Sequence, residues 1–295
     1  MQIGYYPGCS LTGTAREFDK SMRMIAPVLD IELKEVADWN CCGATSAHAT
    51  NRMLSLALPA RVLAIAERDG LDRVLAPCAE CYSRLRFAQV ECREDEKLRR
   101  QISQIIDMDF KADAKAVSMI ELLSEIGIEK IKSSVKIELK GLKVASYYGC
   151  LLVRPPKVVK FDDCEEPVTM DNAVKAMGAD IIDWAFKTEC CGASFSISKT
   201  DVVLDLTGKI LRNARMQGAD IVAVACPMCH SNLDMRQVDI MRKTGENLNI
   251  PILYITQLIG LALGMDAKEL GLKDHFINAM NVMEKITASE AVENG

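Results

Sequence analysis

The sequence predicts an α/β protein that consists of two tandem domains, each with a parallel β-sheet covered by helices. The first observation is a cysteine pattern that occurs twice, as C-x31-CC-x35-C-x2-C and as C-x39-CC-x34-C-x2-C. The second is that matching cysteines lie from 141 residues (9 to 150) to 149 residues (41 to 190) apart. The third is that strand-like and helix-like segments alternate in the same order in both copies. The ten cysteines of the pattern are Cys9, Cys41, Cys42, Cys78 and Cys81 in the first copy, and Cys150, Cys190, Cys191, Cys226 and Cys229 in the second.

The first copy contains two predicted helices and three predicted strands. Residues 15–29 carry apolar side chains three and four positions apart, which predicts a helix. Residues 53–68 are rich in Leu and Ala and end before Gly70, so they predict a longer helix. The strand-like segments of this copy end close to its cysteines and are residues 2–6, 33–39 and 72–76.

The second copy repeats this order of elements. Residues 202–217 predict a helix that corresponds to the helix at 53–68. The strand-like segments are residues 142–147, 180–184 and 220–225, and each precedes a cysteine of the pattern. Parallel sheets with crossover helices form Rossmann-like domains, in which ligands bind beyond the carboxyl ends of the strands. The sequence therefore predicts two tandem, pseudo-repeated Rossmann-like domains with a cysteine-rich site at the C-terminal ends of the strands in each.

The remaining segments set the predicted domain boundaries. Residues 91–134 are highly charged and predict a solvated helical connector, so the first domain with its connector covers residues 1–138 and the second covers 139–295. The insertion at 154–169 has no clear element and, as a long loop, predicts a functional lid. Residues 252–264 predict a strand followed by a short apolar helix, and the polar tail at 287–295 is expected to fray.

Charge and hydropathy exclude several classes of function. The net charge is −5 and aromatic residues make up 5% of the chain, which argues against a nucleic-acid-binding surface. The first residues, MQIGYYPGCS, have neither the basic start nor the apolar region of a secretion signal. The longest apolar stretch, 250–265, is shorter than the roughly 20 residues that a membrane-spanning helix needs. We therefore expect a cytoplasmic protein without a membrane span.

Five thiols in each copy leave three kinds of site to consider. A reducing compartment disfavours structural disulfides, so metal or redox chemistry is the better interpretation. A structural zinc ion takes four ligands, and five thiols exceed that number. A thiol–disulfide exchange site would use one Cys-x-x-Cys pair and leave the vicinal pair without a role. Soft thiolates also select iron–sulfur clusters, and this interpretation is favoured although the common ferredoxin run of cysteines is absent.

Longer motifs around these cysteines resemble a known family. The chain is similar to the CCG-domain family and, within it, to the B subunits of heterodisulfide reductases from methanogenic archaea. The similarity extends over essentially the whole chain. The matching motifs are Tyr6-Pro7-Gly8-Cys9, Cys41-Cys42-Gly43-Ala44, Pro77-Cys78-Ala79-Glu80-Cys81, Tyr148-Gly149-Cys150, Cys190-Cys191-Gly192-Ala193 and the run from Ala225 to Asp234.

This resemblance implies a cofactor, a reaction and partners. It implies two noncubane [4Fe-4S] clusters, each held by the five cysteines of one copy, with both sites taking part in catalysis. The implied reaction is reduction of a small-molecule substrate, the coenzyme M–coenzyme B heterodisulfide, by two one-electron transfers, as a step of methanogenesis. The implied partners are the ferredoxin-like C subunit and the flavin-containing, electron-bifurcating A subunit of a heterodisulfide reductase complex.

Two alternatives remain open at this level. One is a CCG electron-transfer subunit of another oxidoreductase, of the lactate, glycolate or succinate type. The other is a non-enzymatic binding module stabilised by zinc, with zinc in one or both sites.

Residues outside the two patterns provide further candidates. His230 follows the second Cys-x-x-Cys pair directly, and it is either a proton donor for the product thiolates or a helix residue that bonds backbone. Cys92 is expected to be a buried apolar residue and Cys164 an incidental loop thiol. The basic candidates for the anionic groups of a substrate are Arg84, Arg154, Lys157, Lys160 and Lys199.

Overall fold

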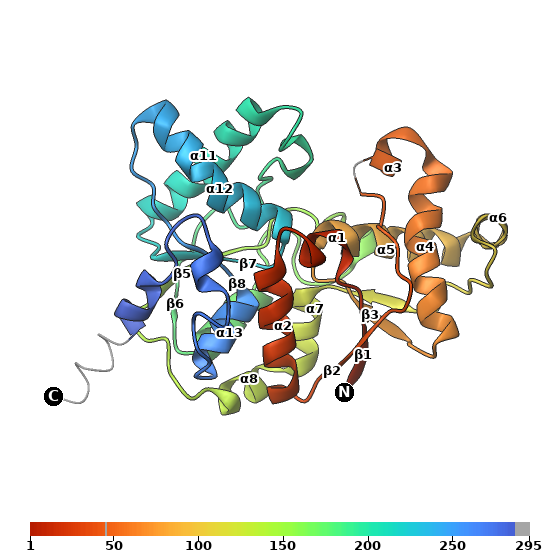
Figure 1. Cartoon of the computed structure of the whole chain (residues 1–295), viewed down its shortest axis with the longest axis horizontal. Coiled ribbons are helices and arrows are strands. Elements are labelled where there is room, and N and C mark those ends of the chain that lie inside the picture. The colour runs from red at the N-terminus through yellow and green to blue at the C-terminus, as the bar shows by residue number, and fades with distance from the viewer. Residues whose placement is uncertain (45, 287–295) are drawn as a thin grey trace.

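The computed structural model describes residues 1–44 and 46–286, and it shows two four-stranded parallel sheets with helices around them. The strand order is β2-β1-β3-β4 in the first sheet and β6-β5-β7-β8 in the second, so the two sheets repeat one topology. All neighbouring strands are parallel. The predicted fold class, two tandem Rossmann-like domains, is confirmed (Figure 1).

The strands are short, and those in the middle of each sheet are almost fully buried. Central β7 has four residues, Ile221, Val222, Ala223 and Val224, all of them buried, as expected for a strand covered on both faces. The bounds in the first sheet are β1 Gln2–Tyr5, β2 Glu32–Glu35, β3 Arg73–Leu75 and β4 Lys115–Val117. The bounds in the second sheet are β5 Lys143–Tyr147, β6 Asp180–Ile181, β7 Ile221–Val224 and β8 Ile252–Tyr254.

Helices connect the strands and cover both sheets. The longest are α12, α4, α11 and α5, and two of these, α5 and α12, begin at a Cys-x-x-Cys pair. The helices of the first half are α1 Gly8–Thr12, α2 Arg16–Val28, α3 Ser46–Thr50, α4 Arg52–Arg68, α5 Ala79–Glu94, α6 Glu96–Ile106, α7 Met119–Ile126 and α8 Ile128–Ser134. Those of the second half are α9 Pro156–Val159, α10 Thr169–Ala176, α11 Thr200–Met216, α12 Pro227–Thr244 and α13 Ile255–Ala262, with short 3-10 turns η1 Ala193–Phe195 and η2 Leu272–Asp274.

The two halves pack tightly against each other. Helices α2 and α13 lie side by side in the centre of the molecule (Figure 1). The ring of Phe18 stacks on that of Tyr254, with centroids 4.2 Å apart, and the hydroxyls of Ser21 and Thr256 are 2.7 Å apart. All four of these side chains are buried. One apolar core therefore continues across both sheets, which holds the two cysteine sites in a defined relation.

Some segments differ from the sequence-based predictions. The charged connector at 91–134 is not wholly helical, because it contains β4, which completes the first sheet. The insertion at 154–169 includes the short helix α9, and the strand predicted at 33–39 ends at Glu35. The predicted tail at 287–295 lies outside the described residues. Within the part of the chain that is described, the helices are too short or too polar to cross a membrane.

Candidate functional site

The cysteines of each copy lie beyond the carboxyl ends of the strands, as predicted. Cys9 follows β1 and lies in the first turn of α1, whereas Cys41 and Cys42 lie in the loop after β2. Cys78 follows β3 as the N-terminal cap of α5, and Cys81 lies in the first turn of that helix. Because parallel strands end at one edge of a sheet, residues far apart in the chain meet there.

The thiols of the first copy form one group. The Sγ atoms of Cys42 and Cys81 are 3.3 Å apart. The Cys9 and Cys41 side chains hydrogen-bond each other, as do those of Cys78 and Cys81. The structure thus brings together all five cysteines that the sequence assigned to the first site.

The second copy repeats these contacts. The Sγ atoms of Cys191 and Cys229 are 3.6 Å apart. The Cys150 thiol hydrogen-bonds Cys190, and Cys226 hydrogen-bonds Cys229. The two sites therefore share a geometry as well as a sequence pattern.

The two sites meet at the boundary between the halves. The Cys78 and Cys226 thiols are close enough to shift each other's pKa, and the backbone N–H of Ala79 also favours the Cys226 thiolate. The Ser194 hydroxyl, beside the second vicinal pair, lies 3.5 Å from Glu80 Oε1 in the first Cys-x-x-Cys segment. The sequence did not predict this contact, which depends on how the two sheets are placed relative to each other.

Hydrogen bonds between the thiols favour the ionised form of some of them. A bond from the Cys150 thiol lowers the pKa of Cys190 to about 6, and the Gly192 N–H adds to the effect. Bonds from Cys229 and then from Cys78 lower the pKa of Cys226. A bond from Cys81 likewise lowers the pKa of Cys42. The partner thiols respond in the opposite direction: hydrogen bonding and burial raise the pKa of Cys81, Cys150 and Cys229. Each site thus contains at least one thiol that favours the thiolate, the form in which cysteine binds metal.

Glycine allows the backbone to approach the second site closely. Gly149 has a φ of +64°, and a Cβ atom built on it would lie 3.1 Å from the Cys229 sulfur. Gly8 has the same role in the first copy, with a φ of +62° and 3.2 Å to the Cys81 sulfur. Any larger residue would both strain the backbone and displace a thiol.

We expect Gly149→Ala to disrupt the second site, whereas Gly218→Ala will not. Gly218 also has a positive φ, +79°, but nothing lies within 4 Å of its Cβ position. Both variants carry the backbone penalty of about 1–2 kcal/mol, and only Gly149→Ala also displaces the Cys229 sulfur. Iron content of the two purified variants measures the difference. Equal iron contents would show that this close approach has no importance for the site.

His230 follows Cys229 in α12, and its ring packs against Tyr254 at the end of β8 and against His275. The ring stacks on Tyr254 with centroids 4.3 Å apart, and its Nε2 atom lies 3.1 Å from both the Ile252 carbonyl oxygen and His275 Nδ1. Burial lowers the pKa of His230 well below its usual value. His275 is half-buried against His230. Asp234 accepts the backbone N–H groups of the segment that carries His275.

Other candidates fall into different roles. Cys92 is fully buried, and burial raises its pKa to about 11, so it behaves as the expected apolar residue. Cys164 lies half-buried in the inserted loop. Arg154 donates to Glu165 Oε2 at 2.6 Å and to the Thr188 carbonyl, so these groups already occupy its guanidinium. Sequence reasoning did not single out Glu80, although an acidic residue between two cysteines of the pattern was a visible signal.

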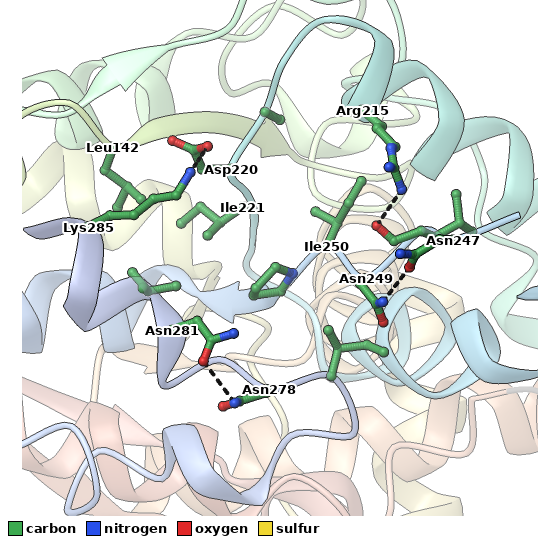
Figure 2. A pocket seen from close by; sticks show the side chains of 15 residues that line it. Leu142, Arg215, Asp220, Ile221, Asn247, Asn249, Ile250, Asn278, Asn281 and Lys285 are labelled. Carbon is green, nitrogen blue, oxygen red and sulfur yellow. Dashed lines mark hydrogen bonds and ion pairs between the residues drawn. The ribbon is translucent and has the colours of Figure 1, made fainter.

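A cavity of about 610 Å³ lies away from the cysteines (Figure 2). Its walls include Ile221 and Ile250, at or before the amino ends of β7 and β8, whereas the thiols lie beyond the carboxyl ends. Lys285 is paired with Asp220 there, and Arg215 donates to the Leu248 carbonyl. The cavity is therefore separate from the two cysteine sites.

The donor set fits an iron–sulfur group. All twelve cysteines lie in the described part of the chain, and all are free thiols. The nearest sulfur pairs, at 3.3 and 3.6 Å, are too far apart for a disulfide bond, which is about 2.05 Å long. Five thiols at each site exceed the four of a tetrahedral zinc site, and soft sulfur ligands suit iron–sulfur clusters.

Comparison with known proteins agrees with this chemistry. The model of the cysteine-rich domain CCG matches residues 3–86 and 144–234. The 8-methylmenaquinol:fumarate reductase membrane anchor subunit of Wolinella succinogenes is 35% identical over 281 residues, which cover 94% of this chain and 98% of that protein. The B subunit of the ferredoxin:CoB-CoM heterodisulfide reductase of Methanosarcina mazei is 30% identical over 292 residues, 97% of each chain.

A solved structure shares the fold alone. The crystal structure of a hypothetical protein from Helicobacter pylori aligns with a TM-score of 0.76 at 12% identity, covering 94% of this chain and 52% of that chain. The match supports the tandem arrangement of the two sheets. On the family match and the two relatives, this chain belongs to the CCG family of cysteine-rich domain proteins and is an iron–sulfur electron-transfer subunit of an oxidoreductase.

Proposed function

We propose that this chain is the disulfide-reducing subunit of a heterodisulfide reductase complex, with one noncubane [4Fe-4S] cluster on each set of five cysteines. The observation that carries the proposal is the contact between the two sites through Cys78 and Cys226. When bound, the two clusters would supply electrons one at a time. Two such centres side by side suit a reaction that needs two electrons at one bond.

The proposed reaction balances with two electrons and two protons. The S–S bond of the coenzyme M–coenzyme B heterodisulfide breaks, each sulfur gains one electron, and each takes one proton to form a thiol. The chain's own residues hold the two sites at a fixed separation, because the paired helices α2 and α13 join the halves. They also exclude water, since Cys42, Cys78, Cys226 and Cys229 are buried.

The source of the protons is part of the same proposal. His230 was proposed from the sequence as the donor, and it lies directly after Cys229 in α12. Its hydrogen bonds to the Ile252 carbonyl and to His275 favour the alternative, in which the ring holds the first turn of α12 against β8. Electrons would come from a ferredoxin-like protein and a flavoprotein of the same complex, because we find no ferredoxin or flavin motif in this sequence.

The test uses anaerobically purified protein with its complex partners, with reduced viologen as the electron donor. On the isolated chain we expect about eight irons with matching sulfide; on the complex we expect two viologen electrons to be consumed for each heterodisulfide reduced to two thiols. About two zinc ions without iron would refute the cluster assignment. Eight irons without disulfide reduction would refute the reaction but keep the clusters.

A second candidate is electron transfer between a quinol and a partner reductase. The relative from Wolinella succinogenes favours it, since that protein is named as the membrane anchor subunit of an 8-methylmenaquinol:fumarate reductase and matches the chain almost from end to end. Re-oxidation of the reduced protein by a menaquinone analogue, without reaction with the heterodisulfide, would select this function over the first.

A further inference from the structure

A pocket lies beside the first cysteine site. Its volume is about 470 Å³, and it is bounded by α3, the start of α4 and the middle of α5. Both α3 and α5 belong to the site, because α3 follows Cys42 and α5 begins after Cys78. The volume is within the range of small-molecule sites. We call it the Arg84 pocket; its lining includes Arg52, Leu56, Arg84, Phe87 and Glu91.

The pocket combines an unpaired positive charge with apolar walls. The Arg84 guanidinium lies over the ring of Phe87, 5.3 Å from its centroid. Across residues 1–44 and 46–286, it has no ion pair and no hydrogen bond. The other arginine of the pocket, Arg52, is paired with Glu91 at 2.9 Å. The Arg84 guanidinium interacts electrostatically with Glu80, one turn earlier in α5, and with Cys42, but it makes no direct ion pair with either and can still receive an anion.

The internal repeat places a different residue at the equivalent position of the second copy. The residue that corresponds to Arg84, 148 positions later, is Asn232, which donates to the Cys191 carbonyl at 3.0 Å. The Ser196 hydroxyl donates a second hydrogen bond to this side chain, to Asn232 Oδ1 at 2.7 Å. In the first copy, Ala47 occupies the position of Ser196 and has no hydroxyl. The Asn232 side chain is thus held by hydrogen bonds at the second site, whereas no hydrogen bond holds the Arg84 guanidinium within the described residues.

We propose that the Arg84 pocket binds the anionic end of the disulfide substrate, a carboxylate, sulfonate or phosphate, while its apolar part lies against Leu56 and Phe87. This inference rests on the proposed function for the presence of a disulfide. Arg84 then acts as a specificity-determining residue, because a guanidinium recognises an oxyanion through two parallel, charge-assisted hydrogen bonds. The substrate enters from the first copy, next to Cys42.

The binding test compares two small thiols that differ in charge. The iron–sulfur-loaded complex is titrated anaerobically by calorimetry with 2-mercaptoethanesulfonate and with neutral 2-mercaptoethanol. We expect the sulfonate to bind at least about tenfold more tightly. Arg84→Gln should abolish this preference and leave 2-mercaptoethanol binding unchanged, and Arg84→Lys should retain part of it.

The matched control is Arg93→Gln, which makes the same charge change on an exposed residue at the far end of α5. It should leave the preference intact. Retention of the preference in Arg84→Gln, or its loss in Arg93→Gln, would overturn the proposal.

Steady-state kinetics separates this inference from the proposed function. Arg84→Gln should raise KM at least about tenfold for an anionic disulfide, and the increase should be several-fold smaller for the neutral bis(2-hydroxyethyl) disulfide. Turnover with equal KM values in wild type and variant would refute the pocket while the function stands. Loss of sulfonate preference without turnover of any disulfide would refute the function while the anion site stands.

Discussion

Cys226→Ala is expected to lose at least half of the iron bound by the wild-type chain. Cys226 is buried and contacts Cys229 in its own site and Cys78 in the other. The substitution therefore removes one of the five thiols of the second site, and this same thiol is the one next to the first site. With about four irons in each cluster, loss of one cluster leaves about four, and damage to both leaves fewer. Iron and sulfide analysis with the visible spectrum measures the result.

Cys92→Ala is the matched control for this variant. Cys92 is also a fully buried cysteine, but it lies in α5 outside both patterns. Its loss removes a small apolar group and should reduce stability by about 1 kcal/mol without any change in iron content. If Cys226→Ala kept the full iron content, or Cys92→Ala lost iron equally, the assignment of the ten cysteines as ligands would be wrong.

Lys187→Met is expected to reduce the free energy of unfolding by about 3–5 kcal/mol. Lys187 Nζ lies 2.7 Å from Asp171 Oδ2, and the two side chains are only 8% and 5% exposed. Removal of the ammonium group leaves a buried carboxylate without its counter-charge. The Lys187 carbonyl also accepts the backbone N–H groups of Tyr148 and Gly149, so Lys187 joins the segment just before Cys150 to the segment just before Cys190.

Urea denaturation of the anaerobically purified protein measures this effect. The exposed pair Lys243–Asp205, at 3.3 Å with side chains 53% and 69% exposed, gives the control. Lys243→Met should change stability by less than about 0.5 kcal/mol. A double variant, Lys187→Met with Asp171→Leu, should recover much of the loss, since apolar residues can replace a buried pair. Equal effects of the two single variants would show that burial of the pair has no energetic importance.

Much of the fold was predictable because the relevant signals are local. Strands such as 220–225 are short apolar runs directly before a cysteine, and helix 53–68 is dense in Leu and Ala. The prediction failed for β4, since Lys115–Val117 has only three residues inside a charged segment. That strand forms because β3 offers it an edge, which is not visible in its own residues. The first sheet therefore needed tertiary pairing to be complete.

The contact between His230 and His275 is likewise one that the sequence alone does not predict. His230 was identifiable from its place after Cys229, but His275 is 45 residues away with no pattern around it. The fold brings the two within 3.1 Å because the C-terminal segment returns to α12 and bonds to Asp234. Contacts between residues so far apart in the sequence depend on the path of the chain through the fold, and not on the local conformational propensity of either residue.

By itself, the sequence determined the duplication, the ten ligand candidates, their chemistry and the α/β class. These follow from the spacing of identical residues and from short-range periodicity, which are properties of the chain alone. Only the tertiary structure decided that the two sites meet near Cys78 and Cys226, and that hydrogen bonds hold Asn232 at the second site but not its counterpart Arg84 at the first, within the described residues. Those features depend on the packing of α2 against α13 and on single side chains at equivalent positions, because the repeat leaves both undetermined.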